Sequence, residues 1–254
     1  MISIITITYN NLDELKRTLN SLPARSEIES IIINGGDDPH VVEYLRNYDG
    51  LVVNEKDAGI ANAFNKGLKL ASGDSIMFLN SGDVLINRAY LNNAKKILMD
   101  NNVQFVHSNL LFVDDHGGKI VMKPPMKNPG RGMPFLHPTM IVKKNVFEEV
   151  GGFNESYKIS MDFEFVLRLL KLNYKSFYVD SVPVVEMDGK GSSVVNEYAA
   201  IKECRRALIE NDNYSLQTKV NLLVRLVLYF FRILLIKTGG SKLLGILKRL
   251  KHNN

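Results

Sequence analysis

Cysteine is almost absent from this chain of 254 residues, in which Cys204 is the only one. A single thiol cannot form a disulfide within the chain, and it cannot build a metal centre from several cysteines. Both features are therefore excluded, and a reducing compartment fits the composition. The first residues, MISIITITYN, lack the basic segment and the cleavage site of a secretory signal, so we expect a protein that faces the cytoplasm.

Acidic residues are missing from the C-terminal part of the chain. From Asn213 onward there are eight Lys or Arg residues and no Asp or Glu, although the whole chain has a formal charge of only +5. Without those eight charges the first 212 residues are at about −3. Because the basic character belongs to the tail, the globular part is not expected to bind nucleic acid.

A long uninterrupted apolar run is also missing from the tail, residues 216–251. A membrane-spanning helix needs about 20 mostly apolar residues, and here Arg225 and Arg232 interrupt the run from Leu222 to Ile236. On a helical wheel these arginines share a face with Asn221, which is typical of a basic amphipathic helix at a membrane surface. The alternative is a pair of helices that pack on the protein or on a partner subunit.

Strand-like and helix-like segments alternate from the N-terminus. Residues 2–8 are a continuous β-branched run, which predicts a strand covered on both faces. A capping box of Asn11 and Glu14 then begins a helix with leucine at helical spacing. Further strand-like segments, with helices between them, lie at residues 28–34, 51–54, 75–80 and 103–108. This alternation predicts βαβ units and a parallel sheet, with Gly73 ending the helix before residue 75.

The second half of the chain changes character. Residues 110–123 resemble a hairpin, and residues 124–134 hold four prolines, as a surface loop does. A strand at residues 135–142, a short helix ended by Gly151 and Gly152, and an amphipathic helix capped by Ser160 are expected next. We predict one α/β domain over residues 1–212 and a helical tail over residues 213–254.

Six segments, in this order, resemble the inverting family 2 glycosyltransferases, especially those that build bacterial surface polysaccharides. The segments are TITYNN, IIINGGDD, NEKDAGIANAFNKGLKLASGD, FLNSGD, EEVGGFNE and MDFEFVLRL. Their joint order and spacing cover about residues 1–190. The resemblance implies the GT-A fold, which is a Rossmann-like mixed sheet flanked by helices, together with a nucleotide-sugar donor and inversion at the transferred sugar.

A nucleotide-sugar donor presents a base, a ribose and a diphosphate, so its pocket needs hydrogen-bonding groups at strand ends. The residues assigned to donor binding are Thr8, Tyr9, Asn34, Asp37, Asp57, Asn65, Lys66, Ser81 and Gly82. Asn and Asp also populate turns, and Asn65 and Lys66 could equally belong to a solvated helix face. Asn34 stands where many relatives carry Asp, and an amide can still read a base edge because it both donates and accepts.

The segment FLNSGD matches the part of the family that carries its metal motif, with Asp83 at the last carboxylate. Asn80 and Gly82 replace acids found in many members. One carboxylate is adequate for Mg²⁺ or Mn²⁺ when the diphosphate and waters supply the other ligands. We therefore expect Asp83 to bind a divalent cation, weakly without nucleotide. The alternative is a buried strand that ends in an ordinary turn.

Asp162, in MDFEF, matches the general base of the family, which takes the proton of the acceptor hydroxyl. Glu164 is the neighbouring acidic position, and His137 is a possible contact to the acceptor or the diphosphate. The alternatives are structural. An Asp in the first turn of a helix stabilises the dipole by about 0.3–1 kcal/mol, and an isolated His usually belongs to the core.

Processive members of the family use a QxxRW motif and a bundle of membrane helices, whereas this chain has no tryptophan. We therefore expect a metal-dependent, non-processive enzyme that moves one sugar, with UDP as the expected nucleotide. The expected acceptor is a lipid-linked saccharide of O-antigen, capsule or exopolysaccharide biosynthesis, at the inner face of the plasma membrane. The alternatives are a sugar-phosphate nucleotidyltransferase, which would need a Gly-rich phosphate loop, and a catalytically silent nucleotide-sugar-binding or scaffold protein.

Overall fold

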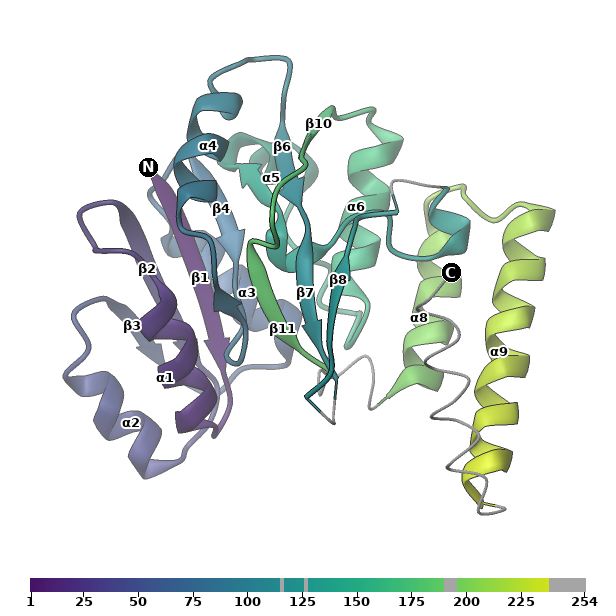
Figure 1. Cartoon of the computed structure of the whole chain (residues 1–254), viewed down its shortest axis with the longest axis horizontal. Coiled ribbons are helices and arrows are strands. Elements are labelled where there is room, and N and C mark those ends of the chain that lie inside the picture. Colours follow the sequence, from purple (N-terminus) through teal and green to yellow (C-terminus); the bar gives the residue numbers. More distant parts are fainter. Residues whose placement is uncertain (115–116, 126–127, 190–195, 238–254) are drawn as a thin grey trace.

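The computed structural model describes residues 1–114, 117–125, 128–189 and 196–237. Seven strands form one sheet in the order β10-β6-β9-β4-β1-β2-β3, and four short strands form a second sheet in the order β5-β11-β7-β8 (Figure 1). The large sheet consists of β1 (Ile2–Thr8), β2 (Ile28–Asn34), β3 (Leu51–Asn54), β4 (Ser75–Phe78), β6 (Phe105–Ser108), β9 (Ile141–Lys143) and β10 (Ser176–Val179). The small sheet consists of β5 (Val84–Leu85), β7 (Leu110–Val113), β8 (Lys119–Met122) and β11 (Val185–Asp188).

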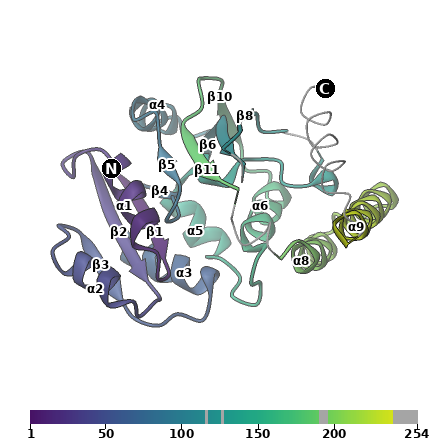
Figure 2. The ribbon, with the colours of Figure 1, turned by 60° about the horizontal axis from the view of Figure 1, so that its bottom comes forward.

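Helices cover both faces of the large sheet (Figure 2). They are α1 (Leu12–Ser21), α2 (Pro39–Arg46), α3 (Ile60–Leu70), α4 (Ala89–Leu98), α5 (Lys144–Val150), α6 (Met161–Lys171), α8 (Glu197–Glu210) and α9 (Leu216–Lys237), with short 3₁₀ turns η1 (Pro129–Arg131) and η2 (His137–Thr139). Neighbouring residues of β1 enter different cores, since Ile4 packs with α1, α2 and α4 while Ile5 packs with α3, α5 and α6. A strand buried on both faces explains the unbroken β-branched run.

The predicted mixed sheet flanked by helices is confirmed. The strand β1 pairs in parallel with β2 and β4, as the βαβ alternation predicts. The sheet is not wholly parallel, because β9 runs antiparallel to both β4 and β6. The expected hairpin is the antiparallel pair β7 and β8, with Gly117 at φ 78° in its turn.

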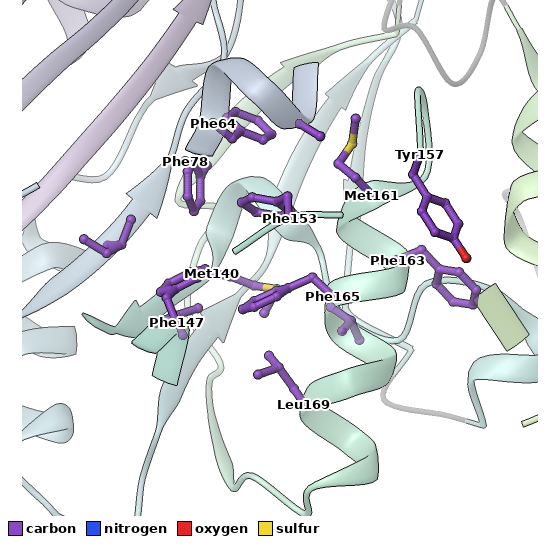
Figure 3. Close-up of a cluster of buried hydrophobic side chains, with 14 of the residues drawn as sticks. Phe64, Phe78, Met140, Phe147, Phe153, Tyr157, Met161, Phe163, Phe165 and Leu169 are labelled. Atoms are coloured by element: carbon purple, nitrogen blue, oxygen red, sulfur yellow. The ribbon is translucent and has the colours of Figure 1, made fainter. Parts of the chain in front are cut away.

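Aromatic side chains fill the space between β4 and α6 (Figure 3). The ring centroids of Phe78 and Phe153 lie 5.0 Å apart, and Phe147 stacks on Phe165 at 4.8 Å. Each such pair stabilises the fold by about 0.5–1.5 kcal/mol in addition to the effect of burying the two rings. The cluster therefore fixes the start of α6, where Asp162 lies, relative to the end of β4.

Two expected element ends are wrong. Gly73 does not end α3, which stops at Leu70; a Cβ at position 73 would lie 2.6 Å from Ser3 Oγ, so glycine is needed for a close crossing over β1. The segment 135–142 is a strand only at its end. Pro138 has no N–H for a ladder, and Thr139 instead donates its hydroxyl to Ser108 O at 3.1 Å.

Ser160 occupies the N-cap position of α6 but does not cap it with its side chain. Its hydroxyl donates to Ala200 O in α8 at 3.3 Å. The carboxylate of Glu203 accepts hydrogen bonds from the backbone N–H groups of residues 158, 159 and 160. The helix α8 thus holds the segment that leads into α6.

The helix α9 lies beside α8 and η1 (Figures 1 and 2), and its orientation differs from the expected one. Asn221 donates to Gly130 O at 3.1 Å, and Arg232 forms an ion pair with Glu197. The face with Asn221 and the two arginines is therefore turned toward the protein. Apolar side chains on the other side are exposed: Val220, Leu223, Val224, Val227, Leu228, Phe230, Phe231 and Leu234.

The expectation that Arg225 and Arg232 meet lipid headgroups is therefore wrong, because neighbouring elements cover that face. Within the described residues no helix is long and apolar enough to cross a membrane. The remainder of the predicted basic tail, from residue 238 onward, lies outside the described residues.

Candidate functional site

A pocket of about 540 Å³ lies where β1 and β4 end. Ligands bind at this edge of open α/β sheets, because loops from neighbouring parallel strands meet there. Four of the residues expected to bind the donor line it: Thr8, Tyr9, Asp57 and Ser81. Asn11, Glu14 and Asn80 complete its polar lining. We call this space the nucleotide pocket.

Three buried side-chain oxygens in the nucleotide pocket have no hydrogen-bond partner in the described part of the chain. They are Thr8 Oγ1, Asn80 Oδ1 and Ser81 Oγ. A buried polar atom without a partner costs about 1–3 kcal/mol, and three in one pocket are not explained by the fold. Such atoms need a partner from outside the described chain, which water or a polar ligand in the pocket would supply.

Asp57 and Gly35 fit together at the edge of the nucleotide pocket. A Cβ at position 35 would lie 1.7 Å from Asp57 Oδ2, so the carboxylate occupies the space that a side chain there would need. Asp57 Oδ1 accepts a hydrogen bond from Gly59 N–H at 2.9 Å. Position 35, directly after Asn34, is therefore glycine, because the Asp57 carboxylate from the loop after β3 leaves no room for a side chain there.

Asn34 and Asp37 do not line the nucleotide pocket. Asn34 is fully buried, and its amide donates to Asn54 Oδ1 at 3.1 Å and accepts from Gly36 N–H at 3.1 Å. The backbone N–H of Asp37 donates to Asn10 Oδ1 at 2.9 Å. Asn10 has φ 53° and organises this loop. Asn10 was not among the residues expected at the site, although it lies within the segment TITYNN.

Asn65 and Lys66 do not line the nucleotide pocket either. The amide of Asn65 donates to Phe153 O at 2.8 Å and accepts from Phe153 N–H at 2.8 Å. Lys66 forms an ion pair with Glu55 at 2.7 Å. Asn65 thus joins α3 to the loop after α5, which is a structural role that the spacing on the helix could not distinguish from sugar binding.

Asp83 closes the turn after β4 from inside the protein. It is 6% exposed, and its Oδ2 accepts from Asn80 N–H at 3.2 Å. Burial raises the pKa of Asp83 to about 7, and the nearby carboxylates of Asp188 and Glu14 act in the same direction. Gly82, at φ 102°, provides the turn and donates its N–H to Thr18 Oγ1. Neither residue lines the nucleotide pocket.

Within the described residues no group of three or more His, Cys, Asp or Glu side chains is placed to hold a metal ion. The oxygens near the turn, from Asn80, Ser81 and Asp83, are nevertheless the hard donors that Mg²⁺ and Mn²⁺ prefer. The residues present therefore fit a cation only if it takes most of its ligands from a bound diphosphate and from water.

A second pocket, of about 580 Å³, adjoins the first and shares Ile60 and Asn80 with it. Asp162 and His137 line it, and we call it the acceptor pocket. Asp162 is half-buried at the start of α6, with Oδ1 accepting from Phe163 N–H at 2.7 Å. Burial lowers the pKa of His137, and the charge of Asp162 opposes that shift.

Glu164 does not reach either pocket. It is 4% exposed, and its two oxygens accept from Arg168 at 2.9 Å each. Arg168 also donates to the carbonyls of Val150 and Gly152 at 2.7 Å, so the pair fastens α6 to the end of α5. The expectation that Glu164 contacts the acceptor or the diphosphate is wrong, because its carboxylate faces Arg168 inside the protein.

The family follows from comparison with known proteins. The model described as "Glycosyl transferase family 2" matches residues 3–158, and the chain therefore belongs to that family. An uncharacterised glycosyltransferase of Mycobacterium tuberculosis is 31% identical over 178 residues, which are 66% of this chain and 68% of that one. One of Haemophilus influenzae is 27% identical over 187 residues, which are 67% of this chain and 62% of that one.

Solved structures share the fold. TarS residues 1–349 of S. aureus, in complex with UDP-GlcNAc, has a TM-score of 0.65 at 19% identity, covering 87% of this chain and 70% of that one. The mannosyltransferase PcManGT from Pyrobaculum calidifontis, in complex with GDP-Man and Mn²⁺, has a TM-score of 0.59 at 16% identity, covering 94% and 79%. The GT-A fold expected from the sequence is confirmed.

Proposed function

We propose that this glycosyltransferase moves one sugar, with inversion, from a UDP-linked donor to a lipid-linked saccharide of cell-surface polysaccharide biosynthesis. The observation that carries the proposal is the pair of adjoining pockets. One contains unpartnered oxygens suited to a polar ligand, the other contains Asp162, and Asn80 lines both. Reacting groups of two substrates bound in them would meet near the end of β4.

In this proposal the nucleotide pocket binds the donor. Thr8, Asn80 and Ser81 offer hydrogen bonds, and Tyr9, at 69% exposure, offers a ring face to the base. Asp83, with Asn80 and Ser81, would hold Mn²⁺ or Mg²⁺. When bound, that cation neutralises charge on the leaving diphosphate.

Asp162 acts as the general base. Its carboxylate accepts the proton of the acceptor hydroxyl while that oxygen bonds to the anomeric carbon, and the bond from this carbon to the diphosphate oxygen breaks on the opposite face. The configuration therefore inverts. His137, kept neutral by burial, lies at the same pocket and orients the acceptor through a hydrogen bond.

The experiment is a thermal-shift panel of nucleotide sugars with the whole chain, with and without Mn²⁺. A ligand at about 100 times its dissociation constant adds about 2.7 kcal/mol to the free energy of unfolding. We expect stabilisation by a UDP-sugar that depends on Mn²⁺. If no nucleotide sugar stabilises the chain with either Mn²⁺ or Mg²⁺, the proposed donor chemistry fails.

We further propose that the protein lies at the inner face of the plasma membrane. Support comes from the exposed apolar side of α9, where Leu228 and Phe231 are 59% and 49% exposed. Beyond Asn213 the chain has six basic residues besides Arg225 and Arg232 and no acidic one, which suits anionic lipid. The apolar side of α9 would enter the lipid interface while its polar side faces the acceptor pocket.

A further inference from the structure

Three arginines line the acceptor pocket. Arg131 comes from η1, and Arg225 and Arg232 come from α9. By contrast, the described residues that line the nucleotide pocket include neither lysine nor arginine. The cationic side chains are thus concentrated on the side of Asp162, away from the pocket whose oxygens suit the donor.

The orientation of α9 is unusual for a helix that packs only for stability. A helix of that kind buries its apolar face and leaves its cations in water, and α9 does bury Leu222 in the core, with Leu226 and Tyr229 packed against it. Here Arg225 and Arg232 are half-buried, while Leu223, Val227 and Leu228 are exposed. Desolvating a guanidinium is unfavourable unless it gains charged or hydrogen-bonding partners. The acceptor pocket also contains the carboxylates of Glu197 and Asp162, so three arginines face two carboxylates, and an anionic ligand would balance the remaining positive charge.

The contacts of these arginines leave them able to bind one. Arg232 pairs with Glu197, and the side chains of this ion pair are 39% and 28% exposed. Burial raises the pKa of the Cys204 thiol, and the charge of the nearby Arg225 partly opposes that shift; a thiol is a weak acceptor. The two arginines are seven residues apart, which is about 10.5 Å along a helix.

We propose that Arg131, Arg225 and Arg232 form an anion-binding subsite of the acceptor pocket, and that the acceptor is a saccharide carrying a phosphate or diphosphate group. This inference rests on the proposed function, because it specifies the chemistry of the acceptor. Guanidinium groups bind phosphate oxygens through paired N–H donors. The phosphate belongs either to a lipid carrier or to the glycan itself.

The test is calorimetry with the whole chain saturated with UDP and Mn²⁺, so that the nucleotide pocket is filled. Farnesyl diphosphate probes a lipid-borne diphosphate, glycerol 3-phosphate probes a glycan phosphate, and farnesol controls for the apolar chain. We expect one phosphorylated probe to bind and farnesol to bind at least tenfold more weakly. The tighter of the two phosphorylated probes identifies the source.

The matched variants are Arg225→Gln with Arg232→Gln against Lys219→Gln, which removes an exposed cation of the same helix. The double variant should bind the phosphorylated probe at least tenfold more weakly and UDP unchanged, whereas the control should match the wild type. Arg225→Lys, which keeps the charge but loses the paired donors, should lie between them.

Equal probe binding in the double variant and the wild type overturns the subsite. An equal loss of UDP affinity also overturns it, because the arginines would then serve the donor. If the wild-type chain does not bind UDP, the proposed function fails instead. In that case the phosphorylated probes are titrated into the wild type and the double variant without nucleotide, and equal binding by the two proteins overturns the subsite.

Discussion

At the scale of single residues, Asp162 has a geometry that suits a base, since it is half-buried at the start of α6 and lines the acceptor pocket. Asp162→Asn keeps the shape but cannot take a proton. We expect sugar transfer to fall by roughly 10²–10⁴, the usual contribution of general-base catalysis. UDP affinity should not change, because Asp162 does not line the nucleotide pocket.

Transfer is measured from a UDP-sugar to membrane extract of the source cells, with UDP binding followed by calorimetry. The control is Glu148→Gln, which changes an exposed carboxylate of α5. A variant at position 162 that transfers sugar at the wild-type rate removes this residue from the role of base.

The raised pKa of Asp83 predicts that, without metal, the stability of the folded protein depends on pH. Its pKa is about 7 in the folded protein against a reference value of 3.8, so the folded state favours the protonated form. The resulting stabilisation is fully present below about pH 4 and is lost as the pH rises through 7. Between pH 5 and pH 8 the loss amounts to about 2–3 kcal/mol.

Asp83→Asn removes this titration and keeps an acceptor for Asn80 N–H. In urea denaturation with a chelator present, the variant should lose less stability between pH 5 and pH 8 than the wild type. The same variant should bind UDP no more tightly with Mn²⁺ than without it. Identical pH profiles of the two proteins would contradict the raised pKa.

At the scale of elements, β6 contains a histidine with an unfavourable environment. His107 is fully buried among Phe105, Phe135 and Tyr178, and in the described part of the chain neither ring nitrogen has a hydrogen-bond partner. Burial lowers its pKa to about 4. Protonation of the unfolded chain therefore reduces stability as the pH falls from about 6.5 toward 4.

His107→Phe should stabilise the fold by about 1–3 kcal/mol at pH 7, since it removes unsatisfied polar atoms. The gain should be larger at pH 5, where the histidine of the unfolded chain is protonated. Thermal unfolding at the two pH values checks this, with the exposed His40→Asn as a control. A variant less stable than the wild type at pH 5 would show that the histidine makes a favourable contact.

At the scale of the whole molecule, the exposed side of α9 predicts vesicle binding that depends on apolar residues and not on the arginines. Leu228→Ser with Phe231→Ser removes two exposed side chains, each able to contribute about 1.5–3 kcal/mol when buried. We expect flotation with anionic vesicles to be lost and solution stability to stay unchanged. Arg225→Glu should leave flotation nearly unchanged, because that side chain faces the acceptor pocket.

The control for flotation is Val121→Ser on β8, which is 54% exposed but lies in another part of the molecule. Sedimentation at several protein concentrations is the accompanying measurement. If the wild type does not float and instead self-associates in a way that the Leu228 and Phe231 changes abolish, the side of α9 is an interface between copies of the chain.

Short-range residue patterns in the sequence were sufficient to predict most helices and strands. The β-branched run of β1, the capping box in which Asn11 Oδ1 accepts from Glu14 N–H, and the glycine end of α5 all depend on neighbours within four residues. The edge of the sheet that holds Thr8 and Ser81 followed from the order of strands and helices. These features are set by short-range geometry, which the sequence determines by itself.

Only the tertiary structure decided which side chains reach the pockets. Asn34 and Asn65 have the residue type and position expected of ligand groups, but Asn54 and Phe153, distant in sequence, take up their hydrogen bonds. The helical wheel correctly put Arg225 and Arg232 on one face, yet the wheel cannot tell which face is covered. That depends on where η1 and α8 pack against α9, and such long-range contacts form only when the whole chain has folded.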